Sequence, residues 1–349
     1  MRRALRLAHR GWGQTAPNPM VGAVVVRDGG VVGEGYHARF GADHAEVVAL
    51  RAAGERARGA TLYVTLEPCA HTGKTPPCAD AVVAAGVARV VIAAEDPSPE
   101  ARGGAARLRA AGVATTVGLE REAARELNAP FFHALASDRP WITLKLAVSL
   151  DAAVADAGRT RGFITGQRSR RMVHALRAGS DAVAVGIGTV LADDPILTAR
   201  STVRPRVAPL RVIFDRTARL PLGTRLVQSA RELPLVVLTE NPDPGRASGL
   251  AAAGVDVVVT AGLADGLRQL RQRGVRSLLV EGGPRIAGAL LAASLVDRLV
   301  IFQAPVVLGA EAADAFAFAP PATVSDARRL RVVERRVLGD DAMTTYALE

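Results

Sequence analysis

Short apolar runs of strand length alternate along the chain with segments of helical periodicity, and this alternation limits the possible folds more than any other feature of the sequence. In the first part of the chain the strand-like runs include residues 21–26, 31–36, 61–66 and 89–94. Alternation at such short spacing is typical of layered α/β domains, in which helices cover the faces of a sheet. The sequence therefore predicts an α/β fold.

These first runs belong to a domain of about 135 residues. Asp28-Gly29-Gly30 separates the first two runs and predicts a hairpin. Amphipathic helices are expected over residues 44–58 and 78–85, and Gly86 closes the second because its freedom at positive φ suits a helix end. The domain is completed by a helix, a strand near residues 113–117 and a last helix through Leu127.

A second α/β domain follows Ser137-Asp138-Arg139-Pro140, the polar stretch at which we place the boundary. It begins with a strand over residues 141–149 and ends with two strand-like runs around Gly339-Asp340-Asp341. Between them lie runs rich in leucine, valine and isoleucine, at residues 182–185, 210–214, 235–238, 255–259, 277–280 and 299–302. The predicted domains are therefore residues 1–138 and 139–349.

The composition fits a globular protein of this size. A length of 349 residues corresponds to two ordinary domains, and 49% hydrophobic with 22% charged residues excludes a disordered chain. A net charge of +10 is typical of nucleic-acid-binding proteins, which we keep as an alternative of another class. However, only two of the 44 basic residues are lysines, and the arginines are scattered along the chain. This dispersal indicates a general preference for arginine at solvent-exposed positions and does not favour a nucleic-acid-binding surface.

The cysteines and the apolar runs indicate the cellular compartment of the protein. Two cysteines, Cys69 and Cys78, fit a reducing compartment. Charged residues interrupt every apolar run near the N-terminus, so we expect no signal peptide, and no apolar stretch approaches the roughly 20 residues of a membrane span. We expect a cytoplasmic homo-oligomer whose partners are small molecules, with neither a nucleic acid nor a membrane among them.

The sharpest local pattern is His44-Ala45-Glu46, followed by Pro68-Cys69 and then Cys78. One imidazole and two thiolates are three zinc ligands, and three protein ligands leave one tetrahedral position for water, as in catalytic zinc sites. His44 and Cys78 each begin a predicted helix, where a lowered thiol pKa favours the thiolate. Each residue alone is better explained as a surface histidine or a buried cysteine, but together they predict that Zn²⁺ is bound.

Glu46 lies two residues after His44, about 200° around a helix, so both side chains reach the metal only if it sits over the helix end. Because two thiolates neutralise Zn²⁺, the metal alone acidifies its water weakly and a separate base is needed. A carboxylate here can take a proton from the water and deliver it to a leaving amine, the general acid/base role in zinc deaminases. Eight residues separate the two cysteines, against two in the short nucleobase-deaminase signature.

This long spacing, with Ala16-Pro17-Asn18-Pro19, Gly35-Tyr36-His37 and the insert His71-Thr72-Gly73-Lys74-Thr75-Pro76-Pro77, resembles the bifunctional riboflavin-biosynthesis deaminase/reductases. The resemblance implies a cytidine-deaminase-like α/β/α domain. Its expected substrate is a diaminopyrimidinone carrying a phosphoribosylamino group, which loses its 2-amino group by hydrolysis. The resemblance also implies substrate contacts by Asn18, His37, His71 and Lys74. Alternatively, Asn18 is a turn residue and His37 a polar group at a strand end.

The second domain contains a candidate anion site. Val280-Glu281-Gly282-Gly283-Pro284 predicts a buried strand, a Gly-Gly turn and a helix with proline in its first turn. Free N–H groups at a helix start suit a pyrophosphate, although most Gly-Gly turns are only turns. Gly186-Ile187-Gly188, with Asp215 ending the next strand, suggests a Rossmann fold. We reject that fold because the third glycine is missing and the intervening prolines leave no room for a crossover helix.

Residues 141–151, 186–200 and 281–284 instead resemble the reductase domain of the same family, which is like dihydrofolate reductase in architecture. The resemblance implies that NADPH delivers a hydride to C1′ of the ring-opened ribosyl group. The expected nucleotide contacts are Ala147, Phe163, Thr189, Asp193, Gly283, Pro284, Arg285, Ile286, Ala287, Gly288 and Ala289. The expected contacts to the sugar-phosphate substrate are Arg161, Arg177, Leu197, Arg200 and Glu281, with Lys145 near the reacting centre. Guanidinium groups suit phosphate, although Arg177 near a helix C-terminus also complements the helix dipole.

Four positions depart from the family pattern. Ala152 stands where glycine is usual, Arg161 and Phe163 stand where serine and tryptophan are common, and Arg216 replaces a serine. Phe163 keeps an aromatic surface, and either arginine could supply charge to a phosphate. We hypothesise that Arg216 approaches the 2′-phosphate of NADPH. The same departures leave open a second enzyme class, a deaminase whose reductase domain is weakened or altered.

Overall fold

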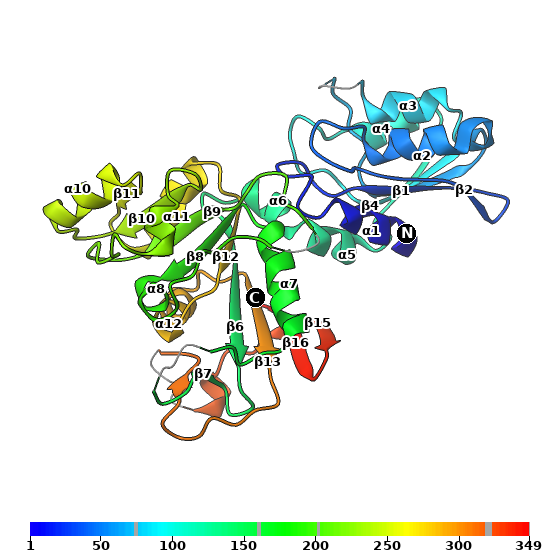
Figure 1. Ribbon diagram of the computed structural model, residues 1–349. Coiled ribbons are helices and arrows are strands. Elements are labelled where there is room, and N and C mark those ends of the chain that lie inside the picture. Colours follow the sequence, from blue (N-terminus) through cyan, green and yellow to red (C-terminus); the bar gives the residue numbers. More distant parts are fainter. Residues whose placement is uncertain (73–75, 159–161, 201–202, 318–322, 349) are drawn as a thin grey trace. The chain divides into compact units, whose positions relative to one another are not determined.

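The computed structural model describes residues 1–72, 76–158, 162–200, 203–317 and 323–348. The chain divides into two compact units, Met1–Ser137 and Asp138–Glu349, each with its own sheet (Figure 1). In the described ranges, no helix combines the length and the apolar character needed to cross a membrane.

The first unit is built on a five-stranded sheet in the order β2-β1-β3-β4-β5. The predicted hairpin is confirmed, since β1 pairs antiparallel with β2, and β3, β4 and β5 run parallel to one another. The strands are β1 (Gly22–Arg27), β2 (Gly30–Tyr36), β3 (Thr61–Leu66), β4 (Arg89–Ala94) and β5 (Ala114–Val117). The parallel half of the sheet brings the carboxyl ends of β3 and β4 to one edge.

Helices cover both faces of this sheet and give the predicted α/β/α layers (Figure 1). Ala49 of α2 and Val82 of α3 pack with Leu62 and Val64 on one face, whereas Leu7 of α1 packs with Val24 on the other. The helices are α1 (Arg2–Ala8), α2 (Ala45–Ala53), α3 (Cys78–Ala84), α4 (Gly104–Ala110), α5 (Arg121–Leu127) and α6 (Ala129–Ala134). Two short 3₁₀ helices span His9–Gly11 and Gly54–Ala57, the second occupying the end of the helix expected over residues 44–58.

Two glycines of β2 allow α2 to lie directly on the sheet. A Cβ at Gly33 would lie 2.3 Å from the carbonyl oxygen of Ala49, and one at Gly35 would lie 2.4 Å from that of Ala45. Real side chains do not tolerate such distances, so only glycine permits this approach. The close packing fixes the start of α2, where His44 precedes the helix and Glu46 lies in its first turn.

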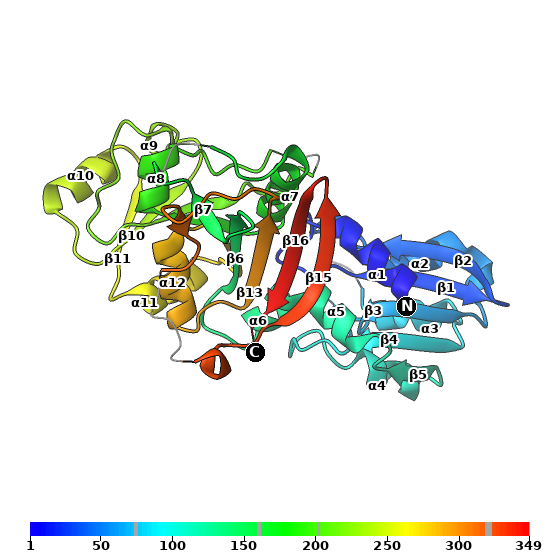
Figure 2. The same cartoon turned by 90° about the horizontal axis from the view of Figure 1, so that it is seen from below.

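The second unit is built on a nine-stranded sheet in the order β11-β10-β9-β8-β12-β6-β13-β16-β15. The strands from β11 to β13 are parallel, and β16 and β15 complete one edge as an antiparallel pair (Figure 2). The strands are β6 (Trp141–Val148), β8 (Ala182–Gly186), β9 (Leu210–Phe214), β10 (Leu235–Thr239), β11 (Asp256–Val259), β12 (Ser277–Val280), β13 (Arg298–Gln303), β15 (Arg331–Leu338) and β16 (Asp341–Ala347). The α/β class predicted for this domain is confirmed.

The helices of the second unit also cover both faces of its sheet. Leu270 of α11 and Leu290 of α12 pack with Leu144 of β6 on one face. Val173 of α7 and Val190 of α8 lie in clusters on the other face. The helices are α7 (Gln167–Ala178), α8 (Ile187–Asp193), α9 (Arg225–Gln228), α10 (Pro244–Ala252), α11 (Leu263–Gln272) and α12 (Pro284–Ala292), with a 3₁₀ turn at Val324–Asp326. Residues of β6 that alternate with the leucines therefore face α7.

Two details of this unit differ from expectation. The segment between the parallel strands β8 and β9 does contain a helix, the seven-residue α8, so the expectation that no crossover helix fits there is wrong. Asp194 at positive φ ends α8 before the prolines, so the helix occupies only the first part of the crossover. A small sheet of β7 (Ala153–Ala155) and β14 (Ala313–Asp314) was not predicted, because strands of three and two residues leave no periodicity to detect.

Ala152, where the family has glycine, adopts a left-handed backbone with φ of 61° in the turn between β6 and β7. This conformation costs an L-residue about 1–2 kcal/mol, whereas glycine adopts it freely and loses about 0.4–1 kcal/mol through the entropy of the unfolded chain. We expect Ala152→Gly to stabilise the second unit by about 0.5–1 kcal/mol. Urea unfolding followed by Trp141 fluorescence in a Trp12→Phe background reports on this unit, because each unit holds one of the two tryptophans. Ala155→Gly within β7 is the control and is expected to destabilise.

Candidate functional site

Three side chains with metal-ligating atoms meet at one end of α2 and α3. His44 is the residue before α2, Cys69 follows β3, and Cys78 is the first residue of α3. His44 Nδ1 lies 3.1 Å from Cys78 Sγ and 3.7 Å from Cys69 Sγ, and all three ligand atoms lie within 4.8 Å of one another. In tetrahedral zinc sites such atoms are about 3.5–3.8 Å apart. The structure thus brings together the three predicted ligands.

The protonation of this cluster suits a divalent metal. A hydrogen bond from the Cys78 thiol lowers the pKa of Cys69, and the same bond together with burial raises the pKa of Cys78. Protons are therefore held on Cys78 and on His44, whose pKa a hydrogen bond with Cys69 raises. A cation that displaces these protons meets one neutral imidazole and two thiolates, a donor set that suits zinc. The residues present therefore fit a zinc ion.

Glu46 lies beside the three ligands. It is in the first turn of α2, is only 3% exposed, and forms a hydrogen bond with Cys78. Burial raises its pKa to about 7, so near neutral pH it can both accept and donate a proton. The start of α2 therefore holds a metal ligand and a proton-transfer group next to each other.

Asn18 and His37 form a pair next to the cluster. The Asp43 carbonyl can only accept, so His37 Nδ1, 3.1 Å away, carries the proton, and Nε2 accepts from Asn18 Nδ2 at 3.2 Å. Burial lowers the pKa of His37, which keeps the ring neutral, and its centroid lies 5.5 Å from that of His44. This arrangement leaves Asn18 Oδ1 as an acceptor for a further group. His71 is exposed, and Lys74 lies outside the described residues.

Two residues that the sequence analysis did not identify hold the segment that carries Cys69. The buried Glu67 carboxylate accepts from the backbone N–H of Asp96 at 3.1 Å, Gly103 at 3.1 Å and Ala105 at 2.9 Å. Arg107 of α4 donates to the carbonyl of Ala70 and to the carboxylate of Asp80 in α3. The one available signal was an acidic residue directly before Pro68-Cys69. Nothing in the sequence pattern pairs Arg107 with either partner.

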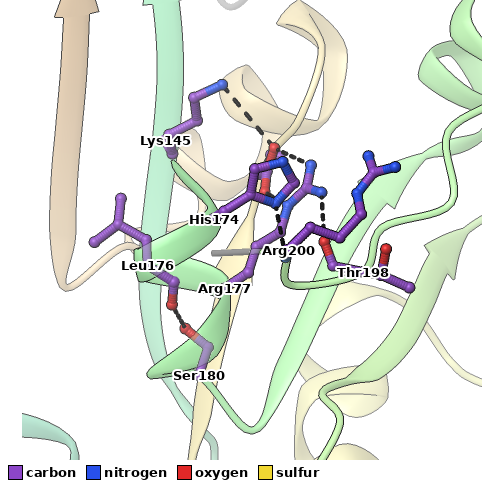
Figure 3. A network of polar contacts seen from close by, with 8 residues as sticks. Lys145, His174, Leu176, Arg177, Ser180, Thr198 and Arg200 are labelled. Atoms are coloured by element: carbon purple, nitrogen blue, oxygen red, sulfur yellow. Dashed lines mark hydrogen bonds and ion pairs between the residues drawn. The ribbon is translucent and has the colours of Figure 1, made fainter. Parts of the chain in front are cut away.

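In the second unit, three charged side chains meet where β12 ends beside β6 (Figure 3). Val280 pairs with Leu144, so the following residue, Glu281, lies next to Lys145. Arg177 of α7 forms a bidentate ion pair with Glu281, in which Nη2 and Oε2 are 2.9 Å apart. Lys145 Nζ lies 4.0 Å from the same oxygen. These side chains are only 9–15% exposed.

Burial and charge act against each other in this cluster. Burial alone would raise the pKa of Glu281, but Arg177 and Lys145 together hold it below its usual value. Burial lowers the pKa of Lys145, with Glu281 opposing and Arg177 adding to the shift. The cluster therefore holds two cations against one carboxylate, which favours an anionic ligand.

The segment after α8 completes this site. Leu197 is 2% exposed and has φ of 60°, a strained conformation for a leucine. The Thr198 carbonyl accepts from Arg177 Nη1 at 3.0 Å, and the Arg200 N–H donates to His174 of α7. The structure thus brings Lys145, Arg177, Arg200 and Glu281 to one region (Figure 3). Arg161 lies outside the described residues.

The residues predicted to contact the nucleotide differ in their burial and in their distance from the Gly-Gly turn. Thr189 of α8 lies against the Gly-Gly turn, since a Cβ at Gly283 would be 3.4 Å from its Oγ1. Pro284 begins α12 as predicted, and Arg285 is exposed, but Ile286, Ala287 and Gly288 are buried and Ala289 is exposed. Ala147 is half-buried on β6, and Asp193 ends α8. Phe163 is 81% exposed, with the guanidinium of Arg170 4.8 Å from its ring centre.

Arg216 follows β9 and is exposed. Its Nε lies 3.3 Å from Glu240 Oε2, an ion pair that the sequence analysis did not predict. Its carbonyl accepts from the N–H groups of Glu240 and Asn241. A phosphate at this place would have to compete with Glu240 for the guanidinium.

Comparison with known proteins finds a family for each of the two units. Residues 1–94 match the family described as "cytidine and deoxycytidylate deaminase zinc-binding region", and residues 140–344 match the RibD C-terminal domain. The riboflavin biosynthesis protein RibD of Aquifex aeolicus is 45% identical, covering 88% of this chain and 87% of the relative. The Escherichia coli protein of the same name is 42% identical, over 98% and 96% of the two chains.

Solved structures also resemble the whole chain. Acinetobacter baumannii RibD has a TM-score of 0.86 at 38% identity, covering 100% of this chain and 97% of that one. A Thermotoga maritima diaminohydroxyphosphoribosylaminopyrimidine deaminase/5-amino-6-(5-phosphoribosylamino)uracil reductase has a TM-score of 0.85 at 34% identity, with the same coverage.

The fold and the sites define a zinc-type deaminase joined to a reductase on one chain. The chain belongs to the RibD family of riboflavin biosynthesis proteins. It is a bifunctional enzyme, and the cofactors of its two domains are zinc and NADPH.

Proposed function

We propose that this chain catalyses the two reactions named for the Thermotoga maritima relative. The deaminase, residues 1–138, removes the 2-amino group of the diaminopyrimidinone substrate by hydrolysis. The reductase, residues 139–349, then converts 5-amino-6-(5-phosphoribosylamino)uracil to the ribitylamino product. The observation that carries the proposal is the buried carboxyl of Glu46 beside His44, Cys69 and Cys78.

In the deaminase, His44, Cys69 and Cys78 hold the metal, and zinc when bound supplies Lewis-acid activation of water. Glu46 accepts a proton from the attacking water on a carboxylate oxygen and passes it to the leaving amine nitrogen. Its burial supports this role, because a carboxyl with a pKa of about 7 can both accept a proton and donate it near neutral pH. Asn18, His37, His71 and Lys74 bind the substrate, with Asn18 Oδ1 accepting from a donor on the pyrimidine.

In the reductase, NADPH when bound supplies the hydride for C1′. Lys145 holds a proton on Nζ at the reacting centre, and Glu281 fixes the positions of Lys145 and Arg177. Arg161, Arg177, Leu197 and Arg200 bind the sugar phosphate. The nucleotide contacts are Ala147, Phe163, Thr189, Asp193 and residues 283–289, of which the first turn of α12 offers free N–H groups.

The test is incubation of purified protein with the diaminopyrimidinone phosphate, with and without NADPH, followed by product mass. Exchange of one amino group for oxygen without NADPH, and a further gain of two hydrogens with it, supports both activities. Deamination without the gain of hydrogen favours the alternative in which the reductase domain is weakened.

Arg216 tests the assignment of the 2′-phosphate. We expect Arg216→Ala to lower the preference for NADPH over NADH by about tenfold, as befits one lost charge-assisted contact. Glu240→Gln is the matched control, because it frees Arg216 from its ion pair and is expected to maintain or increase the preference. The preference is measured as the ratio of kcat/KM for the two nucleotides, and an unchanged ratio in Arg216→Ala contradicts the assignment.

The partners follow from the same chemistry. We propose small phosphorylated pyrimidines as ligands, no nucleic-acid or membrane partner, and a homo-oligomer in the cytoplasm, where both cysteines stay reduced and available to a metal. Tight, salt-sensitive retention of RNA in filter binding at physiological salt would contradict this proposal.

A further inference from the structure

One turn of α7 holds the segment that carries Arg200. The Thr198 carbonyl accepts from Arg177 Nη1 at 3.0 Å, and the Arg200 N–H lies 3.2 Å from His174 Nδ1 (Figure 3). His174 and Arg177 are three residues apart, so they share one face of the helix. Arg177 has been assigned to the substrate site, whereas His174 has no part in the mechanism described above.

We propose that His174 is a positioning residue of the reductase, which presents Arg200 to the phosphorylated substrate only while its imidazole is neutral. The proposal rests on the proposed role of Arg200 as a substrate contact. The chemistry of the contact sets the condition, because a backbone N–H can only donate. Nδ1 must therefore be unprotonated, and the single proton of the neutral ring is on Nε2.

The surroundings of His174 favour this neutral form. Arg177 lies on its own helix, Arg200 is on the segment that it holds, Lys145 comes from β6, and Glu281 follows β12. These are three cations and one carboxylate, and the carboxylate is already paired with Arg177. Burial, Arg177 and Arg200 lower the pKa of His174 below its usual 6.5, although Thr198 and Glu281 oppose the shift.

Acidification reverses the contact. A proton on Nδ1 places two donors face to face, so the Arg200 N–H loses its acceptor and the segment is held to α7 through the contact of Thr198 with Arg177. The KM for the phosphorylated substrate therefore rises as the pH falls through the pKa of His174. Loss of one such hydrogen bond corresponds to about a fivefold change.

Two substitutions separate this role from simple packing. Asparagine places Oδ1 close to the position of the imidazole Nδ1, so His174→Asn keeps an acceptor that cannot be protonated. His174→Leu keeps comparable volume and has no acceptor. Reductase KM and kcat are measured with the deaminated substrate at about pH 7.5 and about pH 5.5. The NADPH dissociation constant reports on the fold of the reductase, and deaminase activity verifies the amount of active chain.

We expect His174→Leu to raise KM about fivefold near pH 7.5 with little change in kcat. We expect His174→Asn to resemble wild type near pH 7.5 and to lose the additional rise of KM that wild type shows near pH 5.5. The substrate phosphate titrates in the same range, but it does so equally for both proteins, so the ratio of their KM values isolates His174.

Three results would overturn the proposal. They are an unchanged KM in His174→Leu, an acid-side rise in His174→Asn equal to that of wild type, and a loss of NADPH binding in both variants. Arg200→Ala separates this failure from failure of the proposed function. If it raises KM while His174→Leu does not, only the positioning role is wrong. If Arg200→Ala leaves KM unchanged, the assignment of Arg200 to the substrate is wrong as well.

Discussion

Replacing Glu46 by glutamine is expected to reduce deamination by about 10²–10⁴-fold, the usual contribution of a general acid/base. The carboxyl is buried beside the three metal ligands, and glutamine keeps its size while removing its ability to accept and return a proton. Glu46→Ala is expected to be equally inactive. The measurement is the initial rate of amine release from the diaminopyrimidinone phosphate.

The second activity of the chain provides the control for this prediction. Both variants should retain zinc, because Glu46 is not one of the three clustered ligands, and should oxidise NADPH at the wild-type rate with deaminated substrate. Zinc content by atomic absorption and NADPH absorbance measure these properties in one preparation. Near-normal deamination in either variant would show that the acid/base role is wrongly assigned.

The metal cluster could be predicted from the sequence because one histidine and two cysteines form a known ligand pattern, although 25 and 34 residues separate His44 from Cys69 and Cys78. His44 precedes α2, Cys78 begins α3 and Cys69 follows β3, so the residue types and the ends of predicted elements were enough to place them together. The supports of the cluster could not be predicted in the same way. Glu67 accepts from N–H groups 29 to 38 residues away, and no periodicity in the sequence encodes such contacts.

In the second unit, too, the strands could be predicted from the sequence and the contacts between distant side chains could not. The buried strands were predicted from their apolar runs, and the register of β12 with β6 then places Glu281 beside Lys145. The left-handed conformation of Leu197 and the hydrogen bond between His174 and Arg200 depend on tertiary packing. The ion pair of Arg216 with Glu240 joins an exposed and a half-buried side chain from separate strand ends, for which the sequence offers no signal.

The cluster of Glu281, Arg177 and Lys145 yields the second large expected effect. Removing one partner of a buried ion pair leaves an uncompensated charge, which typically costs about 3–5 kcal/mol. Because Glu281 is 9% exposed and faces two cations, we expect Glu281→Gln to lower the unfolding free energy of the second unit by about this amount. The measurement is urea unfolding followed by Trp141 in the Trp12→Phe background.

The pH dependence of this variant identifies the cause of its instability. Without Glu281, the pKa of Lys145 falls further below 10.5, because burial and Arg177 already lower it and the one opposing charge is gone. Between the folded and the unfolded pKa the unfolded chain binds more protons, so the stability of Glu281→Gln rises with pH in that window. The deficit relative to wild type should therefore be smaller near pH 9, roughly one to two units below the ordinary lysine pKa, than near pH 7.

Glu334→Gln, which removes an exposed ion pair with Arg336, is the control and should cost about 0.5 kcal/mol or less. If Glu281→Gln is no less stable than Glu334→Gln, the three charges are not coupled as the structure indicates.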